Sequence, residues 1–201
     1  MTGRALVVVD IQPDFCEGGA LGVGGGNDVA EAVAEVVRER DYAYVVATQD
    51  WHVDPGDHFS ESPDFRSTWP PHCRAGTPGA GLHPALQLDR IDATFRKGEH
   101  AAAYSGFEGT TGSGPDHQVG LADWLNSRGV TEVDVVGIAT DHCVRATALD
   151  AVDAGFRTRV LLGLTAGVAR ESTDRALEEL RAAGAELIGR PVVRSQGVSR
   201  S

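Results

Sequence analysis

Short apolar runs rich in β-branched residues recur along the chain, and amphipathic segments separate several of them. Six runs have the length and composition of buried strands: Ala5–Val9, Tyr44–Thr48, Ile91–Phe95, Val133–Ala139, Thr158–Leu162 and Ala185–Ile188. Apolar stripes at helical spacing predict helices at Asn27–Arg40, Gly120–Arg128, Cys143–Ala154 and Ser172–Ala183. This alternation is typical of an α/β fold, in which helices cover both faces of a mainly parallel sheet.

The ends of four of these segments carry residues that are unusual for simple turns. Asp10 and Asp50 follow two of the strands, Lys97 follows a third, and Cys143 lies just after a fourth. Neighbouring parallel strands lie about 4.8 Å apart, so these side chains would come within reach of one another if the strands are neighbours. The alternative is that each aspartate only caps a helix or forms a turn.

The segment from Asp50 to about Leu88 shows little periodicity, although unstructured loops of this length are uncommon in compact domains unless they are functional or disordered. It holds four of the seven histidines, His52, His58, His72 and His83. Asp50 and His52 would point the same way in an extended segment, and the Pro-Gly-Asp turn signal before His58 can fold the chain back toward them.

One carboxylate and three imidazoles, from Asp50, His52, His58 and His72, suit Zn²⁺, Fe²⁺ or Mn²⁺ better than Ca²⁺ or Mg²⁺. The sequence therefore predicts one divalent metal ion at these residues. The alternative is a set of solvated loop histidines. His83, beside Pro84 in an expected turn, is interpreted as structural.

Lys97 is the only lysine among 18 basic residues. An ammonium is a compact charge that fits beside a single carboxylate, whereas the planar guanidinium of arginine needs a wider, forked site. A lone lysine at a strand end thus indicates a position that only an ammonium fits, unless it is simply the one surface lysine left by chance.

Cys143 is expected to open a helix whose N-cap is Thr140 or Asp141. The positive end of a helix dipole favours a thiolate, and free backbone N–H groups in a first turn can bind an oxyanion. Cys143 is therefore a candidate nucleophile rather than an inert buried cysteine. Cys16 and Cys73 lack this context and are interpreted as structural.

Length and charge limit the alternatives. A chain of 201 residues fits one domain at ~100–200 residues per domain, here residues 1–190, with 191–201 as a poorly ordered tail. The net charge of −11 disfavours nucleic acid and anionic membranes as partners.

Cellular location is predicted from the N-terminus and the cysteines. The apolar run before Asp10 is too short for a signal peptide or a membrane span, and three cysteines suggest no disulfide framework. We therefore expect a cytoplasmic protein, as a monomer or homo-oligomer.

Several stretches together resemble one family. VVVDIQPDFCEGGALGV, TQDWHVDPGDHFS, STWPPHCRAGTPGA, FRKG, AYSGFEGT and VVGIATDHCVRATALDAVDAG are similar to nicotinamidases of the bacterial pyrazinamidase type, within the isochorismatase-like cysteine hydrolases. The resemblance runs from about residue 5 to 188. It implies a three-layer α/β/α sandwich with a six-stranded, mainly parallel sheet. It also implies hydrolysis of nicotinamide to nicotinate and ammonia in NAD salvage, with pyrazinamide as a further substrate.

The resemblance also implies roles for individual residues. Asp10, Lys97 and Cys143 would form a catalytic triad, and Asp50, His52, His58 and His72 would bind the metal. The Ile138–Ala139 peptide bond would be cis, and the N–H groups of Ala139 and Cys143 would form an oxyanion hole. The pocket would be lined by Phe15, Leu21, Trp69, Tyr104, Ile138 and His142.

In the resulting hypothesis Cys143 attacks the amide carbonyl while Asp10 takes its proton, and a thioester forms. The metal would bind the pyridine nitrogen and orient the ring. Three alternatives remain open: a ureido or carbamoyl amide as substrate, a metal-stabilised binding module without catalysis, and a metal-hydroxide hydrolase without covalent catalysis. The last of these would leave Lys97 and Cys143 unexplained.

Overall fold

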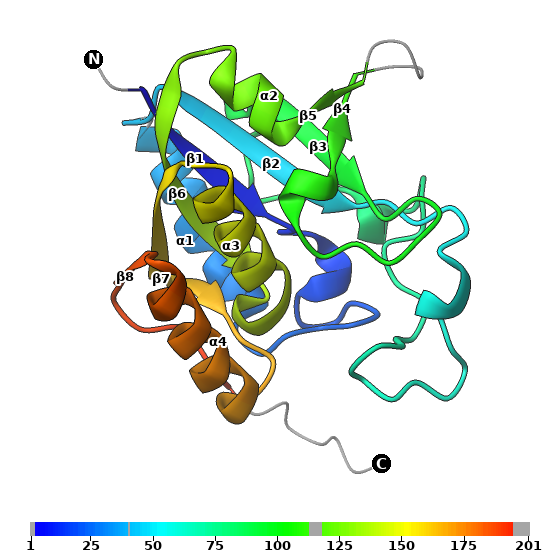
Figure 1. The fold of residues 1–201 in the computed structure, drawn as a ribbon. Coiled ribbons are helices and arrows are strands. Elements are labelled where there is room, and N and C mark those ends of the chain that lie inside the picture. Colours follow the sequence, from blue (N-terminus) through cyan, green and yellow to red (C-terminus); the bar gives the residue numbers. More distant parts are fainter. Residues whose placement is uncertain (1–2, 40, 113–117, 195–201) are drawn as a thin grey trace.

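The sheet of this protein is built around its first strand. A computed structural model describes residues 3–39, 41–112 and 118–194. Within these ranges an eight-stranded sheet has the order β5-β4-β3-β2-β1-β6-β7-β8 (Figure 1). Strands β1, β2, β3, β6, β7 and β8 pair in parallel, whereas β4 and β5 are antiparallel to their neighbours.

All six predicted strands are present, with shifted boundaries. They are β1 (Gly3–Val9), β2 (Tyr44–Asp50), β3 (Ala93–Lys97), β6 (Val130–Ile138), β7 (Arg157–Ala166) and β8 (Glu186–Ile188). The expected number of six strands is wrong, because β4 (Thr110–Thr111) and β5 (Val119–Gly120) extend one edge of the sheet. Two-residue strands are too short to leave a periodic pattern in the sequence.

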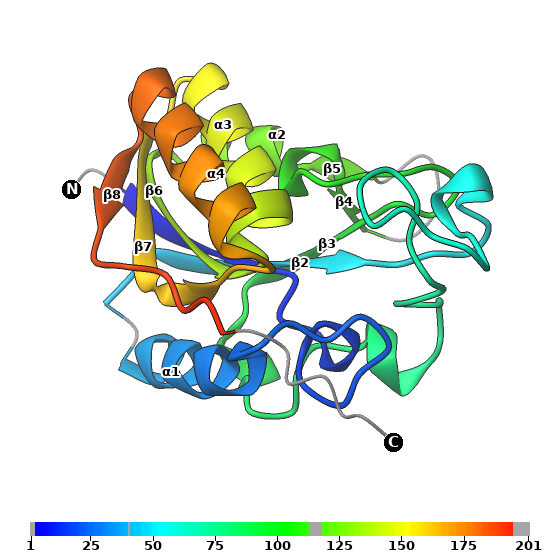
Figure 2. The same cartoon turned by 90° about the horizontal axis from the view of Figure 1, so that it is seen from below.

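The three-layer arrangement is confirmed. Helix α1 (Gly26–Glu39) packs Val29, Val33 and Val37 against one face of the sheet. Helices α2 (Leu121–Asn126), α3 (Arg145–Asp153) and α4 (Arg170–Ala183) cover the other face, as Figure 2 shows. Apolar side chains thus fill a core on each side of the central strands.

The helix expected at Cys143–Ala154 begins differently from the prediction. A π-helical turn at Thr140–Val144 precedes α3, and its N-cap residue is Ala139, which provides no side-chain cap. Neither Thr140 nor Asp141 is therefore the N-cap. The Asp141 carboxylate instead accepts hydrogen bonds from the Val168 N–H (3.0 Å) and from the Ser172 hydroxyl, so it ties this turn to the start of α4.

The strand order reverses between β1 and β6, where the chain continues from β1 to β2 on one side and has β6 on the other. Ligands of open α/β sheets bind in the crevice that such a reversal creates at the carboxyl ends of the strands. Asp10 follows β1 directly, and the π-helical turn that contains Cys143 follows β6 after one residue. The fold therefore places both residues at this crevice.

Backbone hydrogen bonds order the long segment after β2. His52 N–H donates to the Cys73 carbonyl (3.0 Å), and Trp69 N–H donates to the His58 carbonyl (2.9 Å). Single 3₁₀ turns interrupt the chain here and elsewhere: η1 (Pro13–Phe15), η2 (Gly56–His58), η3 (Pro78–Ala80), η4 (Leu88–Arg90) and η5 (Gly106–Glu108). The segment doubles back on itself and so brings its histidines together.

After β8 the chain returns to the sheet. Val192 N–H donates to the Thr165 carbonyl (2.9 Å), and Arg194 forms an ion pair with Asp28 of α1 (2.6 Å). Residues 195–201 of the predicted tail lie outside the described residues, and the single-domain division stays a prediction. In the part of the chain that the structure describes, no helix has both the length and the apolar character needed to cross a bilayer.

Gly137 gives a test of how tightly β1 and β6 pack beside the crevice. It has φ = +120°, and a Cβ atom there would lie 2.0 Å from the Val9 carbonyl oxygen. We expect Gly137→Ala to lower the free energy of unfolding by more than about 2 kcal/mol, measured by urea denaturation. Gly163→Ala is the control, because its Cβ would meet nothing within 4 Å. Equal stability of the two variants would contradict this packing.

Candidate active site and metal centre

The ammonium of Lys97 connects the residues at the four strand ends. Lys97 Nζ lies 2.9 Å from Asp10 Oδ2, forms a second ion pair with Asp50, and lies 3.7 Å from Cys143 Sγ. Ligand atoms of Asp10, Asp50 and Cys143 lie within 4.8 Å of one another. The prediction that these side chains meet is confirmed, because β3, β2, β1 and β6 are consecutive neighbours in the sheet.

This group of charged side chains is buried, and the Lys97 ammonium offsets the two carboxylates together. Lys97 is 2% exposed and Asp10 is 0% exposed. Burial by itself would lower the pKa of Lys97, but the Asp10 and Asp50 carboxylates outweigh it and raise the pKa well above its usual value. A compact ammonium held between two carboxylates agrees with the interpretation of Lys97 as a position for lysine rather than arginine.

The two carboxylates have opposite pKa shifts. Burial raises the pKa of Asp10, and Lys97 only partly offsets it. Burial would also raise the pKa of Asp50, but Lys97, His52 and His72 outweigh it, and the pKa lies well below its usual range. Asp50 is therefore held as a carboxylate, whereas Asp10 is the more basic group and the better proton acceptor.

Thr48 supports Asp10 and was not predicted. Its Oγ1 atom donates a 2.6 Å hydrogen bond to Asp10 Oδ1 and accepts a 3.2 Å hydrogen bond from the Asp10 N–H. Asp10 itself has φ = +46°, a conformation that aspartate tolerates better than most residues. The only signal for Thr48 in the sequence is a hydroxyl within an otherwise apolar strand.

The Cys143 thiol differs from the expectation of a thiolate. Burial raises its pKa well above the usual value and outweighs the opposing effect of Lys97, while Asp10 and Asp50 raise it further. The surroundings therefore favour the protonated thiol over the expected thiolate, because burial disfavours the anion. The thiol must lose its proton to a nearby base before it reacts.

Three histidines converge beside Asp50. His52 Nδ1 lies 2.6 Å from the Gly98 carbonyl oxygen, and His72 Nδ1 lies 2.8 Å from that of Pro70. A carbonyl oxygen only accepts, so each Nδ1 carries a proton, and the corresponding neutral tautomer has its lone pair on Nε2. These two Nε2 atoms lie 3.5 and 3.7 Å from Asp50 Oδ2.

The third histidine completes a set of donors that fits a metal ion. Ligand atoms of His52, His58 and His72 lie within 4.8 Å of one another. Among the described residues, His52 Nε2 and His58 Nδ1 are buried without a hydrogen-bond partner. Burial, reinforced by the other two imidazoles, lowers the pKa of His58 to about 4, so its ring is neutral at pH 7. Imidazole nitrogens beside a carboxylate are a suitable ligand set for a divalent transition metal.

Other residues hold the metal segment in place. Gln12 Nε2 donates to the Asp50 and Ala80 carbonyls (both 2.9 Å), and Gln12 Oε1 accepts from the Asp50 N–H (2.8 Å). Neither prediction nor motif singled out Gln12. His83 lies apart from this group, with Nε2 3.2 Å from Asn27 Oδ1, which agrees with its interpretation as structural.

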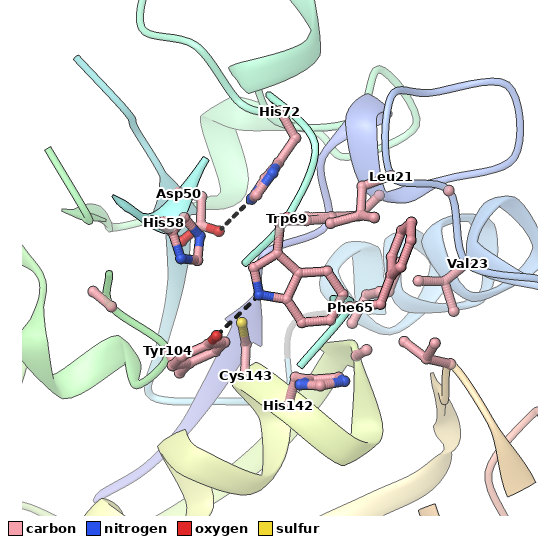
Figure 3. Close-up of a pocket in the computed structure, with 16 residues that line it drawn as sticks. Leu21, Val23, Asp50, His58, Phe65, Trp69, His72, Tyr104, His142 and Cys143 are labelled. Carbon is pink, nitrogen blue, oxygen red and sulfur yellow. Dashed lines mark hydrogen bonds and ion pairs between the residues drawn. The ribbon is translucent and has the colours of Figure 1, made fainter. Parts of the chain in front are cut away.

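A pocket of about 250 Å³ opens above Cys143. All the residues expected to line it do so: Phe15, Leu21, Trp69, Tyr104, Ile138 and His142. Ala139 and Cys143, expected to form the oxyanion hole, line it as well. Figure 3 shows the Cys143 sulfur close to Tyr104, Trp69 and His142. The Trp69 indole N–H donates to the Tyr104 hydroxyl (3.0 Å), and its ring meets His142 edge to face at 5.2 Å. The walls are therefore mainly apolar and aromatic, Asp50, His58 and His72 of the histidine cluster also line the pocket, and its shape suits a small flat ring.

Some lining residues were not singled out from the sequence: Gly22, Val23, Phe65, Ala103 and Val168. They come from loops whose apolar side chains look like ordinary surface or core residues. The Ile138–Ala139 peptide bond is cis, as predicted.

Comparison with known proteins identifies the family. A model of the isochorismatase domain matches residues 4–191. The chain belongs to the isochorismatase family.

Its relatives in this family include nicotinamidases. It is 58% identical over 186 residues to the nicotinamidase/pyrazinamidase of Mycobacterium tuberculosis, covering 92% of this chain and 98% of that one. A pyrazinamidase structure from Pyrococcus horikoshii, in complex with zinc, is 40% identical with a TM-score of 0.76, covering 92% and 98%. The L. infantum PnC1 structure in complex with nicotinate is 36% identical with a TM-score of 0.80, covering 97% and 96%.

These matches confirm the resemblance and the fold class that the motifs predicted. They also confirm the expectation of an enzyme of the hydrolase class, since the curated relatives of highest identity are named nicotinamidases.

Removing the charge of Lys97 tests its place between two carboxylates. We expect Lys97→Met to lower the free energy of unfolding by about 3–5 kcal/mol at pH 7, measured by urea denaturation in the presence of a chelator. In this variant the folded-state pKa of Asp10, already raised by burial, would rise further, and that of Asp50 would rise above its unfolded value. The loss of stability is then full at neutral pH and shrinks as the pH falls toward 4, where both carboxyls become protonated in the unfolded chain as well.

The control is Arg96→Met on the same strand, where the guanidinium is exposed and lies over the Trp51 ring at 3.8 Å. This change should cost about 1 kcal/mol or less at either pH. A Lys97→Met deficit that stayed constant with pH would contradict the charge assignment.

Proposed function

We propose that this member of the isochorismatase family hydrolyses nicotinamide to nicotinate and ammonia through a thioester on Cys143, and that it also hydrolyses pyrazinamide. The observation that carries the proposal is the contact of one buried ammonium with Asp10 and Cys143 at the floor of an aromatic pocket. The activities named for its relatives support the choice of substrate. Nicotinate formation would place the enzyme in NAD salvage.

Asp10 would act as the base in the first step. Its carboxylate takes the proton of the Cys143 thiol while the sulfur forms a bond to the amide carbon and the carbonyl electron pair moves onto oxygen. Burial makes Asp10 more basic than an exposed carboxylate, and the Lys97 ammonium keeps it ionised before the attack. Thr48 fixes the other carboxylate oxygen and so directs Oδ2 toward the site.

The N–H groups of Ala139 and Cys143 would hold the oxyanion of the tetrahedral intermediate. Both residues line the pocket. One such donor is worth about 3–4 kcal/mol in other hydrolases. The carbon–nitrogen bond then breaks, and Asp10 returns the proton to the departing ammonia. Water hydrolyses the remaining thioester, which releases nicotinate and restores the thiol.

The walls of the pocket would position the ring. Phe15, Leu21 and Ile138 supply apolar contacts, and Trp69, Tyr104 and His142 supply aromatic faces and edges. Burial lowers the pKa of His142, which favours a neutral imidazole in this wall. A small heteroaromatic amide therefore matches the pocket in both size and charge.

Asp50, His52, His58 and His72 would hold one divalent ion, Zn²⁺, Fe²⁺ or Mn²⁺. The unpartnered imidazole nitrogens and the zinc complex of the P. horikoshii relative support this assignment. When bound, the ion would act as a Lewis acid toward the pyridine nitrogen and so orient the substrate ring. The chain's own residues in the triad carry the proton transfers.

The thioester gives a direct test. Mass spectrometry of enzyme quenched during nicotinamide turnover should show a nicotinoyl adduct on the peptide that contains Cys143. Cys143→Ala should abolish both the adduct and nicotinate formation, with unchanged metal content, while Cys16→Ala leaves the adduct in place. Turnover by Cys143→Ala at the wild-type rate would refute covalent catalysis.

The metal assignment has a separate readout. His52→Ala should reduce bound zinc, measured by elemental analysis after dialysis, by at least about tenfold, since even supporting residues around a metal contribute ~10–100-fold. Nicotinate formation should fall with it. His83→Ala, in the same segment but outside the cluster, should keep full metal and activity. Full metal and full activity in His52→Ala would show that the assignment is wrong.

A further inference from the structure

A second cavity adjoins the proposed substrate pocket. Its volume is about 570 Å³, and Phe65, Tyr104, His142 and Val168 line both cavities. Figure 3 shows three of these shared residues, Phe65, Tyr104 and His142, around the pocket. Any molecule that crosses this shared rim passes directly between the two cavities.

Positive charge is concentrated in the second cavity. Arg66 from the metal segment, Arg145 at the start of α3 and Arg175 of α4 all line it. Among its described lining residues Asp141 is the one acid, and its carboxylate is already engaged with the Val168 N–H and the Ser172 hydroxyl. Three guanidiniums at one hollow are notable in a chain whose net charge is −11, which by itself repels anions.

The arginines keep hydrogen-bond donors available for a ligand. Arg145 forms an ion pair with Glu179 (3.2 Å) and Arg175 with Glu171 (3.5 Å), each through a single Nη1 atom. Such exposed pairs contribute little, and a guanidinium has five N–H donors. The cavity therefore offers both charge and unused donors.

We infer that this basic cavity is a second binding site, for small aromatic carboxylates. The inference rests on the proposed function, whose product is such an anion and whose substrate is a neutral amide. Guanidinium groups bind carboxylates through paired, charge-assisted hydrogen bonds. The rings of Tyr104 and His142, stacked at 6.3 Å and 26°, form an aromatic rim against which the ring of the anion packs.

The two cavities thus differ in what they select. The pocket above Cys143 has mainly apolar and aromatic walls and no arginine among its lining residues, whereas three arginines of the adjoining cavity recognise the charge that hydrolysis creates. The product leaves the first site for the second, and its occupancy at the shared rim obstructs entry of the next substrate molecule. The cavity is in this way a product-inhibition site.

Calorimetric titration of the metal-loaded protein with nicotinate tests the inference. We expect nicotinate to show two binding events per chain of the wild type. Neutral nicotinamide, titrated into Cys143→Ala to prevent turnover, should show one. In Arg66→Gln/Arg145→Gln the affinity of one nicotinate event should fall by about fivefold or more, and inhibition by nicotinate should weaken in parallel. The KM for nicotinamide should not change.

Arg181→Gln is the matched control, because Arg181 lies at the exposed far end of the same helix as Arg175. If the double variant fails to fold, the single variant Arg66→Gln provides the same test, because Arg66 is exposed and its replacement should not disturb folding. A single nicotinate event in the wild type, equal binding of nicotinamide at the second site, or unchanged inhibition in the arginine variants would overturn the inference. Absence of nicotinamide hydrolysis by the wild type would instead refute the proposed function.

Discussion

One buried ammonium holds this site together. Lys97 lies between Asp10 and Asp50, and all three side chains are almost completely removed from solvent. Two carboxylates this close resist ionising together in a protein interior, because desolvation and mutual repulsion both favour the neutral form. The positive charge of Lys97 is what allows Asp50 to remain a carboxylate beside the histidines and Asp10 to act as the proposed base.

This shared charge links two halves of the proposed chemistry. Asp50 faces the imidazoles of the proposed metal centre, and Asp10 faces the thiol of Cys143. Neighbouring side chains fix both: Thr48 of β2 holds the Asp10 side chain, and Gln12, just before η1, holds the Asp50 backbone. Groups held by a rigid sheet stay in position through a reaction cycle, which is the main requirement for preorganised catalysis.

Charge also separates what the two neighbouring cavities can hold. The inner pocket is apolar apart from the groups at its floor, and the outer one has three arginines in a strongly acidic chain. Such a pattern treats a neutral amide and its carboxylate product differently although they have nearly the same shape. The proposed second site follows from this difference rather than from any one side chain.

The sequence by itself determined the α/β class, six of the strands and the residues at their ends, because buried strands leave uninterrupted apolar runs that strongly polar residues terminate. It also indicated the metal segment, since histidines cluster there without periodicity. Only the tertiary structure decided the two short edge strands, the supporting roles of Thr48 and Gln12, the engagement of Asp141 with α4, and the protonated Cys143 thiol. A pKa or a pocket wall depends on every group that packs around it, and residues such as Phe65 and Val168 reach the site from segments far apart in the chain.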